Sequence, residues 1–492
     1  MGEGQGEWGR DASQLRRFDE YCAPSMAPRP PRRAPPSPAV PSPRRRGATR
    51  LGERPLREDL VTQACLEAFG ASHREGRLAD RALETTLRKR TQLYSNERRA
   101  VAERVYALLR RLRTVDFLAS RGRAGFADLP ASRQDVLRLG ISRVFHGEPA
   151  GAVCRSLGMD AADAEAVAKL PEAARALEAL PRAERFALAA SLPDALAAHF
   201  LSEFGEEAEA AAEAMNERAP LVVRTNTLKI SRAALKARLK DEGVEAEPTA
   251  RSPLGLVLDG RANAFALPSF REGLFEVQDE GSQLLGMLVD PPPTRVVDAC
   301  AGAGGKALQL SAEMKNRGEL FALDVEEGRL EELKRRARRA GVHNARARTI
   351  AADDTSLAQL EDLHGRADRV LVDAPCTGSG TLRRKPDARY RFTEALLAEH
   401  VERQKVLLGR FAQLVKPGGQ LVYGTCSVLR AENEAVVEDF LAQHPDFSLK
   451  PAAERLGPVA GADTTSGGYL RLYPHRHGTD GFFGALLVRR KG

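Results

Sequence analysis

Apolar residues recur at spacings of three and four through the first half of the chain, from about Leu56 to Pro193. The segments LVTQACLEAF and RAVAERVYALLRRLRTVDFLA are examples. This spacing places the apolar side chains on one face of an α-helix. Runs of β-branched residues, which favour strands, are almost absent. The pattern predicts an all-α domain over residues 55–195.

The pattern becomes mixed over residues 196–273. Helical spacing is present in LSEFGEEAEAAAEAMNE and SRAALKARLKDEG, whereas APLVVRTNTLK, GLVLDG and NAFALP have the character of short strands. This stretch predicts a small α+β module.

Strand-like and helix-like segments alternate over residues 274–492. Strands are predicted at TRVVDAC, GELFALDV, RARTIAAD, RVLVDAP and GQLVYGTCS. Helices are predicted at KALQLSAEM, at GRLEELKRRARRAG and from about Glu394 to Val415. Such alternation predicts a Rossmann-like α/β domain with a doubly wound parallel sheet, which binds ligands at the carboxyl ends of its strands.

Composition distinguishes a further segment at the amino terminus. Residues 1–54 are rich in proline and arginine, cannot supply a core, and are predicted to be disordered. The net charge of the whole chain is +8, and nine arginines and one acid, Glu53, within residues 27–57 account for all of it. Nucleic-acid binding by the remaining, formally neutral body would therefore depend on local patches.

Several classes of protein are disfavoured. The chain has no apolar run long enough to span a membrane and no signal-peptide pattern, which predicts a cytoplasmic protein without a membrane partner. Its six cysteines are scattered and form no CxxC or Cys/His cluster, so free thiols are expected and neither disulfides nor a bound metal.

Arginines flank the second clear helix of the all-α region, namely Arg98, Arg99, Arg110, Arg111 and Arg113. This distribution is compatible with a surface that faces phosphates. It is equally compatible with an ordinary solvated helix face.

A glycine-rich turn follows the first predicted strand of the α/β region. The strand ends at Asp298 and continues as ACAGAGGKA, in which Gly302, Gly304 and Ala307 match the pattern GxGxxG/A. Asp324 follows Gly302 by 22 residues, where a carboxylate can hold ribose hydroxyl groups. Alone, this signal fits NAD as readily as S-adenosylmethionine (SAM).

Two adjacent carboxylates end the third predicted strand. One of Asp353 and Asp354 is expected to contact the adenine end of a nucleoside cofactor, and the other to act as a cap or turn residue.

Cysteines stand just past the ends of the fourth and fifth predicted strands. RVLVDAP leads through Asp373 to Cys376, and GQLVYGTCS contains Cys426. Neighbouring parallel strands lie about 5 Å apart, so we expect both thiols in one cleft at the sheet edge. Either cysteine alone is more easily explained as a small buried hydrophobic residue.

With these motifs the chain resembles the RsmB (Sun, or Fmu) family of small-subunit ribosomal RNA cytosine-5 methyltransferases, from about Leu56 to Arg490. The motifs DAPCTGSG and GTCS, the latter followed by Glu432 and Asn433, carry most of the resemblance. NERRAVAERVYALLRRLRTVDFLA is similar to a NusB-type RNA-binding domain, and VVRTNTLK with FEVQDEGSQLL to the connecting module of that family.

The resemblance implies SAM as methyl donor and small-subunit ribosomal RNA as partner, and it implies no obligate protein partner. Cys426 would be the nucleophile, and Cys376 would assist release of the product. Asp373 would lie near both the methionine part of SAM and the target base. The remaining SAM contacts would come from Cys300, Ala301, Gly302, Ala303, Gly304, Gly305, Lys306, Asp324 and Asp353.

The glycine-rich loop departs from the family pattern. The family has a loop close to CAAPGGK, whereas Gly302 and Ala303 occupy its middle in this chain. The fixed φ angle of the proline is lost, which predicts a looser loop.

The chemistry explains why thiols are needed. Carbon 5 of cytosine is a weak nucleophile until a thiolate adds at carbon 6, after which carbon 5 can take up the methyl group. The alternatives are a related enzyme that acts on transfer RNA or on another ribosomal cytosine, and a non-catalytic RNA-binding or assembly factor. An NAD-dependent oxidoreductase would leave both cysteines unexplained. Adenine methylation needs no thiol.

Overall fold

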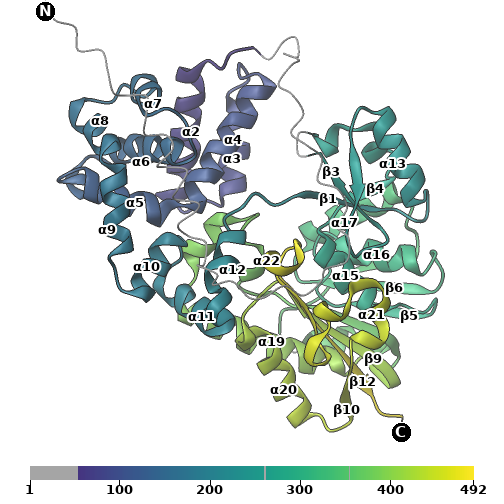
Figure 1. The fold of residues 1–492 in the computed structure, drawn as a ribbon. Helices are drawn as coiled ribbons and strands as arrows, with labels where there is room; N and C mark the ends of the chain where they lie inside the picture. The colour runs from purple at the N-terminus through teal and green to yellow at the C-terminus, as the bar shows by residue number, and fades with distance from the viewer. Residues whose placement is uncertain (1–53, 260–261, 354, 492) are drawn as a thin grey trace, which may run out of the picture. The chain divides into compact units, whose positions relative to one another are not determined.

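The computed structural model describes residues 54–259, 262–353 and 355–491, and the chain divides into two compact units at Asp194–Ala195 (Figure 1). The tail predicted to be disordered, residues 1–54, lies outside the described residues except for Arg54. No helix in the described part of the chain has the length and apolar character needed to cross a membrane.

The first unit is helical, as predicted. Its helices are α2 (Glu58–His73), α3 (Ala79–Lys89), α4 (Ser95–Arg110), α5 (Leu112–Gly122), α6 (Ala131–Phe145), α7 (Ala150–Ser156), α8 (Ala161–Ala168), α9 (Leu170–Glu178) and α10 (Arg182–Ala189), with a 3₁₀ turn η1 (Phe126–Asp128). The apolar faces of these helices are buried, for example at Val61, Val101 and Leu137. The pattern that runs from residue 99 to 119 is divided between α4 and α5, because Arg111 between them has non-helical backbone angles.

The second unit begins with α11 (Asp194–Phe204), η2 (Gly205–Glu207) and α12 (Ala208–Ala214). The helical spacing of residues 201–217 predicts one helix, which is wrong. Gly205 has a φ of +56°, in the left-handed region, and this breaks the helix.

A four-stranded antiparallel sheet follows, in the order β2-β3-β1-β4. Its elements are β1 (Leu221–Thr225), α13 (Arg232–Asp241), β2 (Ala246–Pro248), β3 (Gly255–Leu258), η3 (Ala264–Ala266), α14 (Pro268–Arg271) and β4 (Phe275–Val277). The small core contains Val223, Leu239 and Phe275. The strand predicted at NAFALP is wrong, because these residues form η3 and the start of α14. The sheet takes in β4, which lies past the predicted module end at residue 273.

The rest of the unit is built on a second sheet, in the order β10-β12-β9-β8-β5-β6-β7, with β11 paired to β12. The strands are β5 (Arg295–Asp298), β6 (Glu319–Asp324), β7 (Ala345–Thr349), β8 (Ala367–Asp373), β9 (Val415–Thr425), β10 (Phe447–Lys450), β11 (Leu470–Leu472) and β12 (Phe482–Arg489). Strands β5 to β9 are mutually parallel, as predicted, whereas β10, β11 and β12 pair antiparallel.

Helices cover both faces of this sheet (Figure 1). They are α15 (Glu280–Val289), α16 (Gly305–Glu313), α17 (Glu327–Ala340), α18 (Thr355–Gln359), α19 (Glu394–Ala412), α20 (Glu434–Gln443), α21 (Ala453–Ala460) and α22 (Pro474–His477), with short 3₁₀ turns between them. Successive strand residues point to opposite faces, so Val296 packs in one core and Val297 in the other. Both faces are thus buried, as in a doubly wound fold.

Two predicted boundaries in this sheet are wrong for identifiable reasons. The helix expected to run from Glu394 to Val415 ends at Ala412, and Val415 already begins β9. Pro417 disfavours helical backbone at the residue before it, so the helix has to end earlier. The third strand ends at Thr349 rather than at Asp353, because β7 is an edge strand whose pairing with β6 stops at Thr349.

Candidate active site

The carboxyl ends of four neighbouring strands meet at one edge of the large sheet. In sheet order the strands are β9, β8, β5 and β6, and their last residues are Thr425, Asp373, Asp298 and Asp324. Cys426 directly follows β9, and Cys376 lies three residues after β8. Residues from distant parts of the sequence therefore share one edge, as the doubly wound topology requires.

The loop between β5 and α16 turns on two glycines in the left-handed region, Gly302 with φ +52° and Gly304 with φ +88°. A Cβ atom at Gly304 would lie 2.6 Å from Cγ of Leu333, so no larger residue fits without rearrangement. The Gly302 amide donates a hydrogen bond of 2.8 Å to Oδ2 of Asp324. The carboxylate predicted to hold a ribose therefore also holds the loop, and its remaining lone pairs can accept from further donors.

Asp298, the last residue of β5, is a buried carboxylate just before this loop. The residue is 1% exposed, and neither of its carboxylate oxygens has a hydrogen-bond partner among the described residues. Burial, with a smaller contribution from the nearby Asp373 carboxylate, raises the pKa of Asp298 to about 7. A buried acid in this state suits a cationic ligand group such as the ammonium of SAM. Its position at a strand end before a glycine-rich turn is the sequence signal for it.

Lys306, the last residue of the loop sequence, connects α16 to β8. Its Nζ donates a hydrogen bond of 2.6 Å to Oδ2 of Asp373. Burial is the largest single effect and opposes the charged form of Lys306, but the combined attraction to Asp373, Asp298 and Cys426 outweighs it and raises the pKa of the lysine. The ion pair fixes one oxygen of Asp373, while the side chain stays 28% exposed and open to a ligand.

Cys376 and Cys426 lie next to each other at this edge of the sheet. Their Sγ atoms are 3.4 Å apart, within hydrogen-bond distance for sulfur. A hydrogen bond from Cys376 lowers the pKa of Cys426, and the charge of Lys306 acts in the same direction. The same hydrogen bond and burial raise the pKa of Cys376. The arrangement therefore favours a thiolate at Cys426 and a protonated donor at Cys376.

The loop that carries Cys376 is held by a fully buried carboxylate, Glu432. Its Oε1 accepts from the amide of Thr377 at 2.8 Å, and its Oε2 accepts from the Thr377 hydroxyl at 2.5 Å. The side-chain amide of Gln404 donates to Oε1 and also to the carbonyl of Pro375, both at 3.0 Å. Glu432 therefore fixes the backbone on both sides of Cys376.

We expect Glu432→Ala to lower the free energy of unfolding by about 3 kcal/mol, because it removes the acceptor of the partly buried Thr377 amide and hydroxyl and one of the two acceptors of the buried Gln404 amide. Urea denaturation of the purified chain measures this change. The matched control is Glu438→Ala, which removes an exposed carboxylate paired with Arg430 and should change stability by less than about 1 kcal/mol. A loss below about 1 kcal/mol for Glu432→Ala would contradict this role.

The residue after Glu432 holds the second cysteine loop. Asn433 accepts a hydrogen bond of 2.6 Å from the Thr425 hydroxyl and donates one of 3.0 Å to the Ser427 carbonyl. The Cys426 carbonyl accepts from the Gly380 amide at 2.9 Å, which links the two cysteine loops directly. Both thiols are thus carried on backbone that is fixed on each side.

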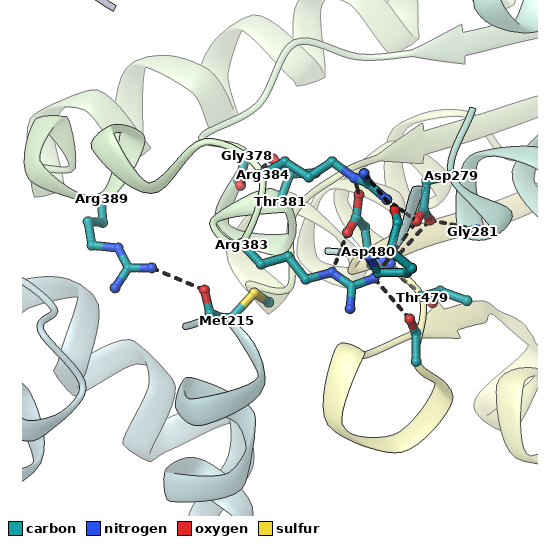
Figure 2. A network of polar contacts seen from close by, with 12 residues as sticks. Met215, Asp279, Gly281, Gly378, Thr381, Arg383, Arg384, Arg389, Thr479 and Asp480 are labelled. Carbon is teal, nitrogen blue, oxygen red and sulfur yellow. Dashed lines mark hydrogen bonds and ion pairs between the residues drawn. The ribbon is translucent and has the colours of Figure 1, made fainter. Parts of the chain in front are cut away.

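A buried network of charges anchors the segment that follows Cys376 (Figure 2). Nε of Arg383 donates to Asp480 at 2.5 Å, and Arg384 binds both Asp480 and Asp279. Nη2 of Arg383 also donates to the Gly478 carbonyl at 2.9 Å. Burial and the proximity of Asp480 raise the pKa of Asp279. These pairs join the Cys376 loop to the start of α15 and to the loop before β12.

Two further predicted residues have structural roles. The partly buried Cys300 side chain packs against the core between the sheet and α19, and burial raises the pKa of its thiol. Asp353 is exposed and accepts hydrogen bonds from the amide and hydroxyl of Thr355, as a turn residue does. Asp354 lies outside the described residues.

Most arginines around α4 contact the protein itself. Arg98 donates to the carbonyls of Leu93 and Arg90, and Arg111 donates to that of Ala189. Arg113 pairs with Asp194, and Arg110 lies over the ring of Tyr106. Among the described residues of this group only Arg99 is exposed, so the five arginines do not form one solvent-facing surface.

Comparison with known proteins agrees with the fold. A family model described as 16S rRNA methyltransferase RsmB/F matches residues 287–488, and an RsmF/B-like ferredoxin-like domain matches residues 192–264. The probable ribosomal RNA small subunit methyltransferase B of Synechocystis is 33% identical over 85% of this chain and 96% of its own length. The ribosomal RNA small subunit methyltransferase B of Xylella fastidiosa is 38% identical over 61% of this chain and 69% of its own length.

Two solved structures are also similar. The crystal structure of PH0851 has a TM-score of 0.72 and 28% identity, and covers 89% of this chain and 100% of that one. A methyltransferase homolog protein from Pyrococcus horikoshii has a TM-score of 0.53 and 31% identity. The match covers 63% of this chain and 99% of that one.

The doubly wound sheet, its glycine-rich loop and these similarities define a SAM-dependent RNA methyltransferase. The chain belongs to the RsmB/F family of methyltransferases. The four-stranded sheet before the catalytic domain is the ferredoxin-like module of that family. Asp298, Asp324 and the glycine loop fit SAM, because they offer a buried anion, a hydroxyl acceptor and a close backbone approach.

Proposed function

We propose that this protein methylates carbon 5 of a cytosine in small-subunit ribosomal RNA through a covalent adduct with Cys426. The observation that carries the proposal is the pair of thiols 3.4 Å apart at the ends of β8 and β9, beside Asp373. Transfer to an exocyclic nitrogen or to a ribose needs no thiol, whereas activation of carbon 5 needs a nucleophile at carbon 6. The names of the relatives support ribosomal RNA as the substrate.

SAM would be held by the loop from Cys300 to Lys306, by Asp324 at the ribose and by Asp298 near its amino group. Asp353 remains a proposed contact near adenine. When bound, SAM supplies an electrophilic methyl group. The residues of this chain then have to activate carbon 5, orient the base and release the product.

Cys426 begins the reaction as a thiolate, favoured by its hydrogen bond from Cys376 and by the charge of Lys306. The sulfur forms a bond to carbon 6, and the electron pair of the 5,6 double bond makes carbon 5 nucleophilic. Asp373, whose Oδ2 is held by Lys306, can accept a hydrogen bond from the amino group of the base and, once nitrogen 3 has taken up a proton from solvent as the adduct forms, from nitrogen 3, and so stabilise the adduct.

Release of the product breaks the bond between the Cys426 sulfur and carbon 6. Once carbon 5 carries the methyl group, a base removes the remaining proton from carbon 5, the double bond re-forms, and the carbon–sulfur bond breaks. The departing Cys426 sulfur takes the electron pair of that bond. Cys376, which keeps its proton, donates a hydrogen bond to the leaving thiolate and so assists release.

RNA contacts outside the cleft are proposed for two regions. The helical residues 55–195, with their resemblance to a NusB-type domain, and the ferredoxin-like module would present the RNA strand. The target base would have to leave any stack to reach both thiols, as in other enzymes that act on bases.

We expect the purified chain to transfer label from methyl-labelled SAM to small-subunit ribosomal RNA transcribed without modifications. Nuclease digestion and mass spectrometry of the nucleosides should identify the product as 5-methylcytosine. Unmodified transfer RNA serves as the comparison substrate and should remain unlabelled. Label only in transfer RNA, or in a nucleoside other than 5-methylcytosine, would contradict the proposal.

A further inference from the structure

The carbonyl of Ala303, in the middle of the glycine-rich loop, is held from outside by an arginine on α17. Nη1 of Arg336 donates a hydrogen bond of 2.8 Å to this carbonyl. The same guanidinium contacts Oε2 of Glu276 through Nε at 3.2 Å and Nη2 at 3.0 Å. Arg336 therefore binds the carboxylate through Nε and Nη2 and the loop carbonyl through Nη1.

Glu276 is itself fixed in position. It lies on β4 of the ferredoxin-like module, directly opposite Arg224 on β1, and its side chain is only 4% exposed. Its other oxygen, Oε1, pairs with Arg339, whose guanidinium stacks over the ring of Phe270 at 3.8 Å. Because the carboxylate is buried and doubly paired, it leaves Arg336 little freedom to turn away from the loop.

The loop needs such support. Gly302 and Gly304 flank Ala303 and both have left-handed backbone angles, φ +52° and +88°. Glycine has access to many more backbone conformations than other residues, so ordering this segment for a ligand is entropically costly. Asp324 holds the amide of Gly302 and Arg336 holds the carbonyl of Ala303, so the two anchors fix successive residues of the loop.

We propose that Arg336, held by Glu276, is a positioning residue that preorganises the SAM-binding loop and replaces the rigidity that a proline at position 303 would give. This inference rests on the proposed function in that SAM is bound by this loop. The same contacts join the ferredoxin-like module to the cofactor site, because Glu276 belongs to the module and Ala303 to the loop.

The test is the affinity of the full chain for SAM alone, measured by isothermal titration calorimetry without RNA. Arg336→Met keeps the apolar part of the side chain but removes the guanidinium group. It should weaken SAM binding roughly tenfold, as for loss of a charged hydrogen bond. The matched control is Arg338→Met, the same change at an exposed position of the same helix, which should change affinity by less than about twofold. Arg336→Met with affinity within about twofold of the unmodified chain overturns the proposal.

A rescue experiment separates positioning from general stability. Ala303 has no positive φ, and no hydrogen bond from its amide is found among the described residues, so proline at position 303 meets no positive φ and removes no hydrogen bond of the described residues. Ala303→Pro added to Arg336→Met should restore SAM affinity to within about threefold. With a saturating SAM concentration, Arg336→Met should keep kcat and the KM for RNA within about twofold, while the KM for SAM rises. A loss of affinity that proline does not restore overturns the proposal.

Two additional variants keep the test decisive. If Arg336→Met does not fold, Arg336→Lys keeps the positive charge beside Glu276 but cannot reach both acceptors, and it should weaken SAM binding by about threefold. Asp324→Ala tests the location of the SAM site itself. Unchanged affinity in Asp324→Ala would place SAM elsewhere and refute that part of the proposed function, whereas an effect of Asp324→Ala without one of Arg336→Met refutes only the role of Arg336.

Discussion

Cys426→Ala is expected to abolish methyl transfer to RNA, with a loss of about ten-thousandfold or more in kcat, as for removal of the nucleophile in other covalent enzymes. Without this sulfur no bond forms at carbon 6, and carbon 5 stays too weak a nucleophile to take the methyl group. Cys376 should not take over, because burial raises the pKa of its thiol even without the hydrogen bond that Cys426→Ala removes. Transfer of labelled methyl groups to ribosomal RNA over several hours measures the residual rate.

The folded state and the cofactor site should be unaffected by this change. Cys426 packs only partly against the core, so its replacement by alanine creates little cavity, and SAM affinity should remain within about threefold. Cys154→Ala is the matched control, since Cys154 is a partly buried free thiol of α7. Its activity should equal that of the unmodified chain. A Cys426→Ala enzyme that still turns over at a tenth of the normal rate would refute the nucleophile assignment.

The parts of the site that the sequence predicts are those with local signals. A strand with a run of buried apolar residues that ends in a polar residue, such as β8 with Asp373, can be identified without coordinates. The order of parallel strands in a doubly wound sheet then brings β8 and β9 together, which is why two cysteines far apart in sequence were expected in one cleft. The glycine pattern with Asp324 is a signal of the same local kind.

The parts that the sequence does not predict depend on long-range contacts. Glu276 and Arg336 are 60 residues apart and lie in different modules, so nothing local indicates that they meet. Whether the Asp298 carboxylate has a hydrogen-bond partner depends on all the residues that pack around it. The end of β7 also depends on a long-range contact, because this edge strand ends where its pairing with β6 ends. Two wrong boundaries do have local signals, namely Gly205 within the helix predicted over residues 201–217 and Pro417 after α19.

The second cysteine should give the opposite phenotype. In Cys376→Ala the nucleophile is present, so the adduct at carbon 6 still forms and carbon 5 can still be methylated. The variant lacks the thiol whose Sγ lies 3.4 Å from Cys426 and lowers the pKa of that residue. A thiol with a higher pKa is a poorer leaving group, so breakdown of the adduct becomes slow.

We therefore expect Cys376→Ala to remain covalently attached to RNA after reaction with SAM, as a band of reduced mobility that survives boiling in detergent and disappears on ribonuclease treatment. Multiple turnover should fall by roughly a hundredfold, the usual scale for loss of a proton-donating group, while a single turnover still places label on the RNA. The double variant Cys376→Ala/Cys426→Ala should give no such band, because the bond to carbon 6 requires Cys426. If the band persists in the double variant, another residue is the nucleophile. If Cys376→Ala turns over normally and leaves no adduct, Cys376 has no part in release and its proximity to Cys426 serves only the fold.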